Sequence, residues 1–195
     1  MVAPSKPRPA SVEDLRAIAD NDRLEIIGSE IVEKAMPSPK HGFAESQLGG
    51  LLHPFNRRPG SRGPGGWWIM LEIHVEYSGG IYCHDAAGWR RDRLAAMPSE
   101  WPVKTSPDWV CEIVSPKHER QDLVVKPRVL HAAQVPHYWV LHPEQKMLIV
   151  NRWTQVGYTA VLNVTSGETV RAEPFEAIEI RVGELFGDED DEDDE

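Results

Sequence analysis

Two acidic residues lie where the sequence otherwise predicts buried strands. Glu112 stands inside the apolar run WVCEIV at residues 109–114, and Asp85 ends the run IYCHD at residues 81–85. Burying a carboxylate is costly unless a cation or hydrogen-bond donors compensate it. An acid at the end of a strand more often caps a turn or faces solvent. Because turn-forming residues follow both acids, a shared polar site is the alternative interpretation.

A magnesium ion suits two such acids, and Mn²⁺ is an alternative cofactor. Mg²⁺ prefers hard oxygen ligands, and in phosphodiester hydrolysis it polarises the phosphate and lowers the pKa of an attacking water. A nearby lysine would offset the charge that develops on the phosphate. Lys126 is the candidate because it follows Asp122 by one helical turn. On spacing alone, an ordinary exposed pair between these two residues is the better interpretation.

Hydrophobic periodicity and turn residues predict the elements that must position these side chains. Strands are predicted at residues 23–27, 30–35, 67–77, 81–87, 109–114, 137–141, 146–153, 158–164 and 177–180. Helices are predicted at residues 12–19, 41–55, within 119–133 and at 182–186. Pro37 and Pro39 interrupt the pattern before the second helix, and Pro127 either kinks the third helix or occupies its first turn. The order indicates an α/β fold, with a mixed central β-sheet flanked by helices and β-hairpin extensions.

Composition favours one globular domain. The chain has 195 residues, of which 41% are hydrophobic. We expect a flexible segment at residues 1–10, a folded domain at 11–187 and a disordered acidic tail at 188–195. The net charge of -10 argues against a generic nucleic-acid binder, but the eight acids of the tail account for all but about -2 of it. Two cysteines, no secretory signal and no membrane-spanning stretch predict a cytoplasmic protein.

The motifs together resemble a known family. Residues 84–91 (HDAAGWRR), residues 106–116 (SPDWVCEIVSP) and Lys126 resemble the Uma-two restriction endonuclease family of the PD-(D/E)XK nuclease superfamily. Residues 135–140 (VPHYWV) and 171–175 (RAEPF) are similar to later segments of that family, so the resemblance runs from about residue 24 to 185. It implies a restriction-endonuclease-like fold and a magnesium-dependent endonuclease acting on DNA. Nucleases of this fold are often homodimers.

The resemblance also implies roles for individual residues. Asp85 and Glu112 would bind the metal, and the carbonyl of Ile113 would complete the protein ligands. The superfamily's usual lysine two residues after the second acid is Val114 here, and Lys126 on the next helix would replace it as the third catalytic residue. Glu45 would be an accessory acid, although a solvent-facing helix residue is an equally good interpretation.

One departure and two arginines complete the candidate site. His84 stands where the family usually has a proline. It would add a nitrogen ligand only if strand alternation did not turn it to the face opposite Asp85. Arg90 and Arg91 are candidates for contacts with phosphate groups. The neighbouring Trp89 is expected in the core rather than against a base.

Two other classes of function remain open. A non-catalytic module on the same fold would bind nucleic acid or a protein partner. The acidic net charge, Val114 in place of lysine and His84 in place of proline favour it. An oligomeric interaction protein, in which apolar carboxy-terminal hairpins pair between subunits, is the third hypothesis.

Overall fold

The computed structural model describes residues 8–18, 23–34, 36–60, 63–116 and 119–188. Most of the segment 1–10 and most of the acidic tail 188–195 lie outside these ranges. Within the described part, no helix combines the length and apolar character needed to cross a membrane.

The amino-terminal region is a short helix followed by a hairpin. Helix α1 (Val12–Arg16) begins at a capping box in which Ser11 and Asp14 exchange side-chain and backbone hydrogen bonds. It is shorter than the predicted helix 12–19, whose last residue lies outside the described residues. Strands β1 (Leu24–Ile27) and β2 (Glu30–Glu33) form the predicted antiparallel hairpin, with Gly28 and Ser29 in the turn.

The second helix, α2 (Pro39–Leu52), begins at a proline rather than after it. Ser38 accepts a hydrogen bond from the His41 amide, and Pro39 occupies the first turn. Proline is favoured there because its fixed φ suits a helix and the amide it lacks would have no partner within the helix. The prediction that Pro39 interrupts the chain before the helix was therefore wrong. A 3₁₀ turn, η2 (His53–Asn56), continues from the end of α2.

In the part of the chain that the structure describes, the central sheet is mixed and has eight strands, in the order β2-β1-β4-β5-β6-β7-β8, with β3 paired to β4 outside this path. Its remaining strands are β3 (Trp67–Tyr77), β4 (Gly80–Arg90), β5 (Trp109–Ile113), β6 (His137–His142), β7 (Met147–Thr154) and β8 (Gly157–Thr165). Among the described pairs of these strands, β5 and β6 are parallel and the others are antiparallel. The predicted α/β class with a mixed sheet, flanking helices and hairpin extensions is confirmed.

Strand β4 changes its neighbour along one edge. It pairs with β3 from Gly80 to Arg90, except at Asp85. On the other edge, Gly80 and Ile81 pair with β1, whereas Ala86 to Gly88 pair with β5. Residues 82–85 pair with neither β1 nor β5 in the described structure. The sheet therefore divides at this point, and we call the gap between β1 and β5 the fork.

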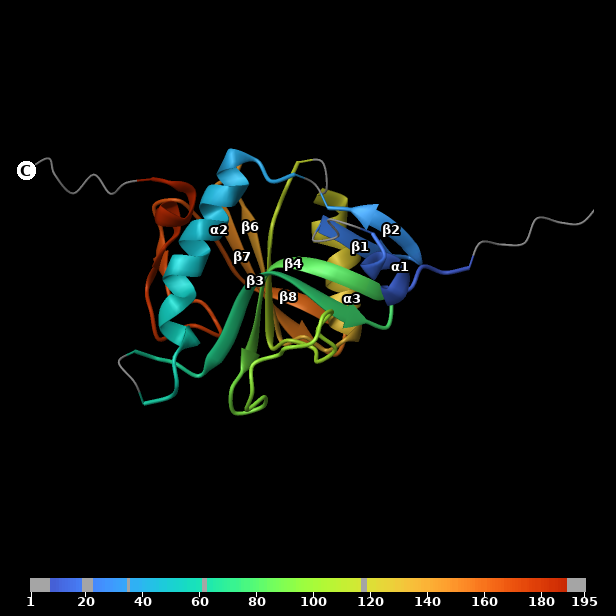
Figure 1. Ribbon diagram of the computed structural model, residues 1–195. Coiled ribbons are helices and arrows are strands. Elements are labelled where there is room, and N and C mark those ends of the chain that lie inside the picture. Colours follow the sequence, from blue (N-terminus) through green and yellow to red (C-terminus); the bar gives the residue numbers. More distant parts are fainter. Residues whose placement is uncertain (1–7, 19–22, 35, 61–62, 117–118, 189–195) are drawn as a thin grey trace, which may run out of the picture.

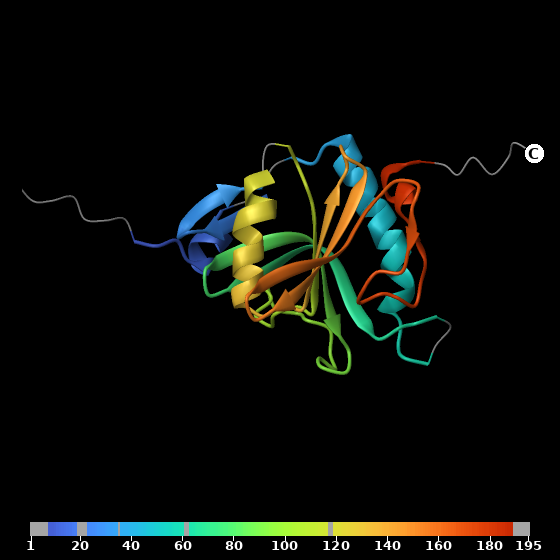
Figure 2. The same ribbon diagram turned by 180° about the vertical axis from the view of Figure 1, so that it is seen from behind.

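Helices cover both faces of the sheet (Figures 1 and 2). On one face α2 packs beside η4 (Val182–Phe186), over a core that includes Leu48, Trp109 and Phe175. On the other face lies α3 (Lys126–Ala132), whose Leu130 belongs to a second core. A π-helical turn, η3 (Gln121–Val125), precedes α3, and Pro127 occupies the first turn of α3, one of its two predicted positions.

The carboxy-terminal segment differs from prediction in its two short strands. A two-stranded sheet joins β9 (Thr169–Val170) to β10 (Ile180–Arg181). Of the predicted strand 177–180 only Ile180 is in a strand, and β9 was not predicted. Strands of two residues are too short for an alternating pattern to reveal them.

Candidate active site

The fork brings Asp85 and Glu112 together. The ladder between β4 and β5 ends at the pair Ala86–Cys111, so the next pair in register would be Asp85 and Glu112. Instead of a backbone pair, the Ile113 amide donates to Asp85 Oδ2 at 2.5 Å. A second carboxylate closes the fork on the side of β1, where the Cys83 amide donates to Glu25 Oε1 at 2.9 Å. Side-chain oxygens thus accept the hydrogen bonds that a neighbouring strand would otherwise accept.

Lys126 is deeply buried among carboxylates rather than exposed. Its Nζ lies 2.6 Å from Glu112 Oε2 and 3.2 Å from Asp122 Oδ1, and Glu25 Oε1 is 3.9 Å away. The side chain is only 3% exposed. The interpretation of an ordinary exposed pair with Asp122 was therefore wrong, because the pair faces the interior between α3 and the sheet.

His84 also reaches Glu112. Its Nδ1 lies 2.5 Å from Glu112 Oε1, and its Nε2 lies 2.8 Å from the Tyr77 hydroxyl. Strand alternation leads to the expectation that His84 points away from the site, but the irregular geometry at the fork lets the ring orient Glu112. Both ring nitrogens have partners, so His84 is placed to position Glu112. Burial, with Lys126 nearby, lowers the pKa of His84 to about 3 and keeps the ring neutral.

A second lysine, Lys34 from the end of the β1–β2 hairpin, neutralises Asp85. Its Nζ lies 2.6 Å from Asp85 Oδ1 and 2.9 Å from Glu72 Oε2. Although burial acts to raise the pKa of Asp85, Lys34 and His41 hold it below its usual value. The sequence alone did not single out Lys34, His41, Glu25 or Glu72. An acid within the apolar strand LEII is the one signal that would have suggested Glu25.

Glu112 and Asp122 are harder to ionise than in water. Burial raises the pKa of Glu112 to about 8, against the opposing effect of Lys126. Burial likewise raises the pKa of Asp122 to about 6. Lys126 keeps its charge, since Glu112 and Asp122 raise its pKa despite burial. The site therefore holds more carboxylates than the two lysines neutralise.

The residues of the fork fit a divalent cation. Four buried carboxylates, those of Glu25, Asp85, Glu112 and Asp122, face two lysines. Asp85 Oδ1 is a buried oxygen with no hydrogen bond, because its ion pair with Lys34 lacks hydrogen-bond geometry. These side chains line a small pocket of about 20 Å³, which is room for a water-sized ion. Ile113 also lines this pocket.

The remaining predicted residues lie nearby or along β4. Glu45 on α2 is half-buried, near His41 and Glu72. Arg90 is exposed and pairs with Asp92 at 3.2 Å. Arg91 donates to the carbonyls of Trp67 and Asn56 and stacks on Trp68, so its guanidinium has structural partners. Trp89 is fully buried, as expected of a core residue.

A divided mixed sheet with paired acids and two lysines at the division fits a restriction-endonuclease-like domain of the nuclease class. The chain belongs to the Uma2 family, described as "Putative restriction endonuclease", which matches residues 11–183. The family resemblance found in the sequence is confirmed. No curated protein matches the chain.

A solved structure shows the same fold. It is the crystal structure of a "putative nuclease belonging to DUF820" from Anabaena variabilis ATCC 29413, with a TM-score of 0.66 and 17% sequence identity. The match covers 91% of this chain and 98% of that chain. At this identity the likeness concerns the fold alone.

Proposed function

We propose that the protein is a metal-dependent endonuclease that hydrolyses phosphodiester bonds, with DNA as its substrate. The observation that carries the proposal is the excess of buried carboxylates over lysines at the fork. Two lysines shared among four buried carboxylates compensate them incompletely, and a divalent cation is the compensation that suits a pocket lined with oxygen atoms. The family supports the nuclease class.

In this proposal Asp85 and Glu112 hold Mg²⁺ or Mn²⁺, with the Ile113 carbonyl as a further ligand. The ion, when bound, supplies Lewis-acid stabilisation of the phosphate and a lowered pKa for its water. His84 and Lys126 orient the two oxygens of Glu112. Because Lys126 is deeply buried, it would stabilise the negative charges of Glu112 and Asp122 rather than contact the phosphate directly.

Lys34 is the cation better placed to meet a phosphate group. Its side chain is 12% exposed, against 3% for Lys126, and its ammonium group forms an ion pair with Asp85. Arg90 would add a positioning contact at the far end of β4, five residues from Asp85 and about 17 Å along the strand. Such contacts fix the register of a nucleic acid without reading its sequence.

Plasmid cleavage tests the proposal. Wild-type protein, Glu112→Gln and the exposed-site control Glu144→Gln are incubated with supercoiled plasmid in Mg²⁺, Mn²⁺ or EDTA. We expect cleavage by wild type and the control only with metal, and a rate at least about 100-fold lower for Glu112→Gln. Absence of cleavage with both metals, or equal cleavage by Glu112→Gln, would contradict the proposal.

One observation favours a non-catalytic DNA-binding or protein-binding module instead. Asp85 and Glu112 already have ion pairs with Lys34 and Lys126, so the protein partly neutralises its own site. Fluorescence anisotropy with labelled DNA distinguishes the two functions. Binding that is equally tight in EDTA, combined with no cleavage, would support the DNA-binding form of this alternative.

A further inference from the structure

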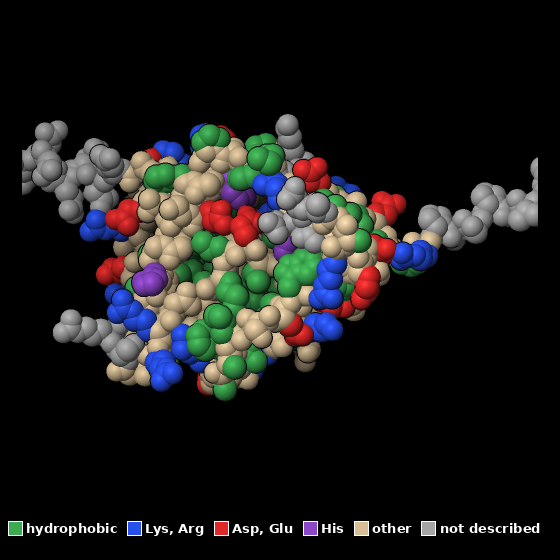
Figure 3. Space-filling view, in the orientation of Figure 1, with side chains coloured by type: hydrophobic (Ala, Val, Ile, Leu, Met, Phe, Trp, Pro, Cys, Tyr) green, Lys and Arg blue, Asp and Glu red, His purple; other side chains and the backbone are tan. Residues whose placement is uncertain are grey.

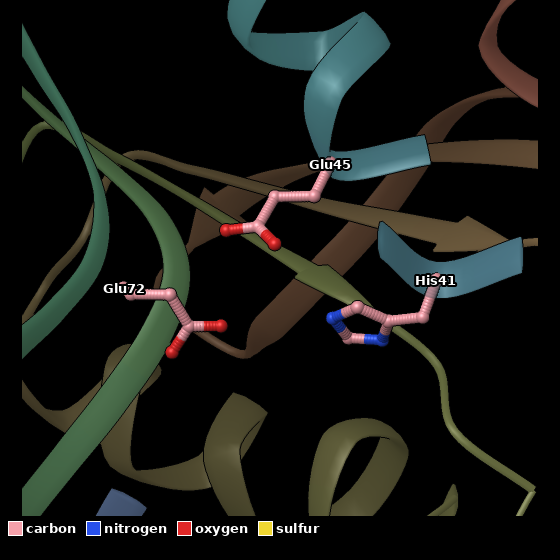
Figure 4. Close-up of side chains that lie close together, drawn as sticks. All are labelled: His41, Glu45 and Glu72. Atoms are coloured by element: carbon pink, nitrogen blue, oxygen red, sulfur yellow. The ribbon is translucent and has the colours of Figure 1, made fainter. Parts of the chain in front are cut away.

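A second group of possible metal ligands lies beside the fork. His41 and Glu45 stand one helical turn apart on α2, and Glu72 belongs to β3. One ligand atom from each residue lies within 4.8 Å of the others. Figure 4 shows the three side chains pointing toward a common centre from the helix and the strand. In the space-filling view of Figure 3, acidic side chains and a histidine gather beside α2.

His41 supplies an observation that the acids alone do not. The residue is only 4% exposed, and its Nε2 is a buried nitrogen with no hydrogen bond. Its Nδ1 lies 3.4 Å from Ser115 Oγ. When Nδ1 donates to Ser115, release of the Nε2 proton leaves a lone pair there for a metal, and this is how outer hydrogen bonds orient histidine ligands of metals. Asp85 Oδ1, 3.5 Å from Nε2, places this group next to the fork.

Glu72 has an unusual backbone conformation. Its φ of 45° is left-handed, and it lies in the middle of β3, whereas Ser29, Gln134 and Lys146, which also have positive φ, lie in turns. Left-handed backbone costs a non-glycine residue on the order of 1 kcal/mol and persists at sites that over-determine it. In register, Glu72 stands opposite Asp85, at the one position where the β3–β4 pairing is interrupted.

Close packing of α2 on β3 brings the two glutamates together. A Cβ atom on Gly49 would lie 3.2 Å from Leu71 Cδ1, so the helix approaches the strand at a glycine. Glu45 is one turn before Gly49, and Glu72 follows Leu71. Burial and the charges of Glu72 and Asp85 raise the pKa of Glu45, although His41 and Lys34 act in the opposite direction.

We propose that His41, Glu45 and Glu72 bind a second divalent cation, of the transition-metal class represented by Mn²⁺ and Zn²⁺. One imidazole with two carboxylates is a donor set that favours these ions over Mg²⁺, which prefers oxygen ligands alone. The site goes beyond the proposed nuclease centre, because it requires neither Glu112 nor Lys126. A transition-metal ion there would lie beside the Asp85 end of the fork.

Counting bound Mn²⁺ by electron paramagnetic resonance tests this site without measuring activity. The proteins are wild type, His41→Ala, Glu45→Gln, Glu112→Gln and the control His53→Ala, which removes an exposed histidine just after α2. We expect His41→Ala and Glu45→Gln to lose one Mn²⁺ or to bind it at least about tenfold more weakly. We expect His53→Ala to match wild type. Circular dichroism establishes that each variant is folded. If His41→Ala does not fold, the result for Glu45→Gln decides whether the second site exists.

The outcomes separate the two proposals. Loss of a Mn²⁺ in Glu45→Gln but not in Glu112→Gln supports the second site even if the nuclease proposal fails. Loss of a Mn²⁺ in Glu112→Gln alone would support only the metal site at the fork and would contradict the second site. Pulsed resonance adds a direct signal, since nitrogen coupling from a histidine should be present in wild type and absent in folded His41→Ala. Unchanged Mn²⁺ binding in Glu45→Gln, or no nitrogen coupling in wild type, would overturn the inference.

Discussion

Lys34 and Lys126 share the task of compensating buried acids, but they come from opposite sides of the fork. Lys34 follows β2 and contacts Asp85, whereas Lys126 begins α3 and contacts Glu112. Removing one partner of a buried ion pair leaves an uncompensated charge, and this usually costs more than the intact pair contributes. The lysines therefore differ from the exposed lysines of the same chain.

Replacing Lys34 tests this difference. We expect Lys34→Met to lower the free energy of unfolding by about 2–4 kcal/mol in EDTA, because Asp85 loses its cation. Saturating Mg²⁺ should restore part of the loss. The control is Lys40→Met, which removes an exposed pair with Glu144 and should change stability by less than about 1 kcal/mol. Urea denaturation measures both, and equal effects of the two substitutions would show that Asp85 does not depend on Lys34.

The raised pKa of Glu112 predicts a pH-dependent stability. The folded protein favours the protonated acid, so this contribution is full below the ordinary pKa of 4.5 and is lost as pH rises through about 8. His84 acts in the opposite direction, but its contribution is lost only below pH 6.5. Between pH 6.5 and 8, metal-free wild type should therefore lose stability, by at most about 1.4 kcal/mol per pH unit from this group.

Glu112→Gln provides the comparison, because glutamine cannot ionise. Its unfolding free energy should decline less than that of wild type over the same pH range, as measured by urea denaturation in EDTA. Parallel profiles for the two proteins would exclude a titrating Glu112 in this window.

The sequence revealed only part of this site. Asp85 and Glu112 were found because acids interrupt apolar strands, a signal that is local. Lys34, His41 and Glu72 stand in segments where charged or polar residues are ordinary. Their proximity to Asp85 depends on how the hairpin and α2 pack against β4, and spacing along the chain does not encode that packing. Ideal alternation led to the expectation that His84 faces away, but this alternation does not hold at the fork, and the ring reaches Glu112.

At the scale of elements, the junction between β1 and β4 depends on one glycine. Gly80 has a φ of 142°, and a Cβ atom there would lie 1.8 Å from the carbonyl oxygen of Ile26. No side chain fits without separating the two strands. The hairpin that carries Glu25 and Lys34 is docked on β4 through this contact.

Gly80→Ala is expected to reduce stability by more than about 3 kcal/mol, because both the backbone angle and the space are lost. The adjacent Gly79 is a matched control, since its Cβ would meet no atom closer than 3.8 Å. Gly79→Ala should change stability by about 1 kcal/mol or less. Thermal unfolding compares them, and a melting temperature for Gly80→Ala close to that of Gly79→Ala would contradict this account.

The elements themselves were largely predictable from local pattern. β3 was predicted with its observed bounds, and β5 and β6 to within one residue, because their apolar runs are bounded by turn residues. The connection of β4 to both β1 and β5 was not predictable, since it joins residues far apart in the sequence. β9 and β10 have too few residues to show a period.

At the scale of the molecule, the formal charge is unevenly distributed. Residues 189–195 are all Asp or Glu, so removing them changes the net charge from -10 to -3. We expect a chain ending at Asp188 to keep its melting temperature and to bind DNA several-fold more tightly at low salt, because repulsion from phosphate falls. Fluorescence anisotropy at several salt concentrations measures this difference. An affinity equal to that of the full chain at low salt would show that these acids do not repel the nucleic acid.

The attachment of the β1–β2 hairpin has a further consequence. Within the described residues, two backbone pairs join it to β4, and the apolar cluster beside it has three buried side chains, those of Leu15 on α1, Ile26 on β1 and Ile81 on β4. Such a unit should exchange its amide hydrogens with solvent before the two main cores do. Each opening would carry Glu25 and Lys34 away and expose Asp85 to water, while the rest of the sheet stays folded. Protection factors for the β1 amides would then report how often the buried charges become accessible to ions.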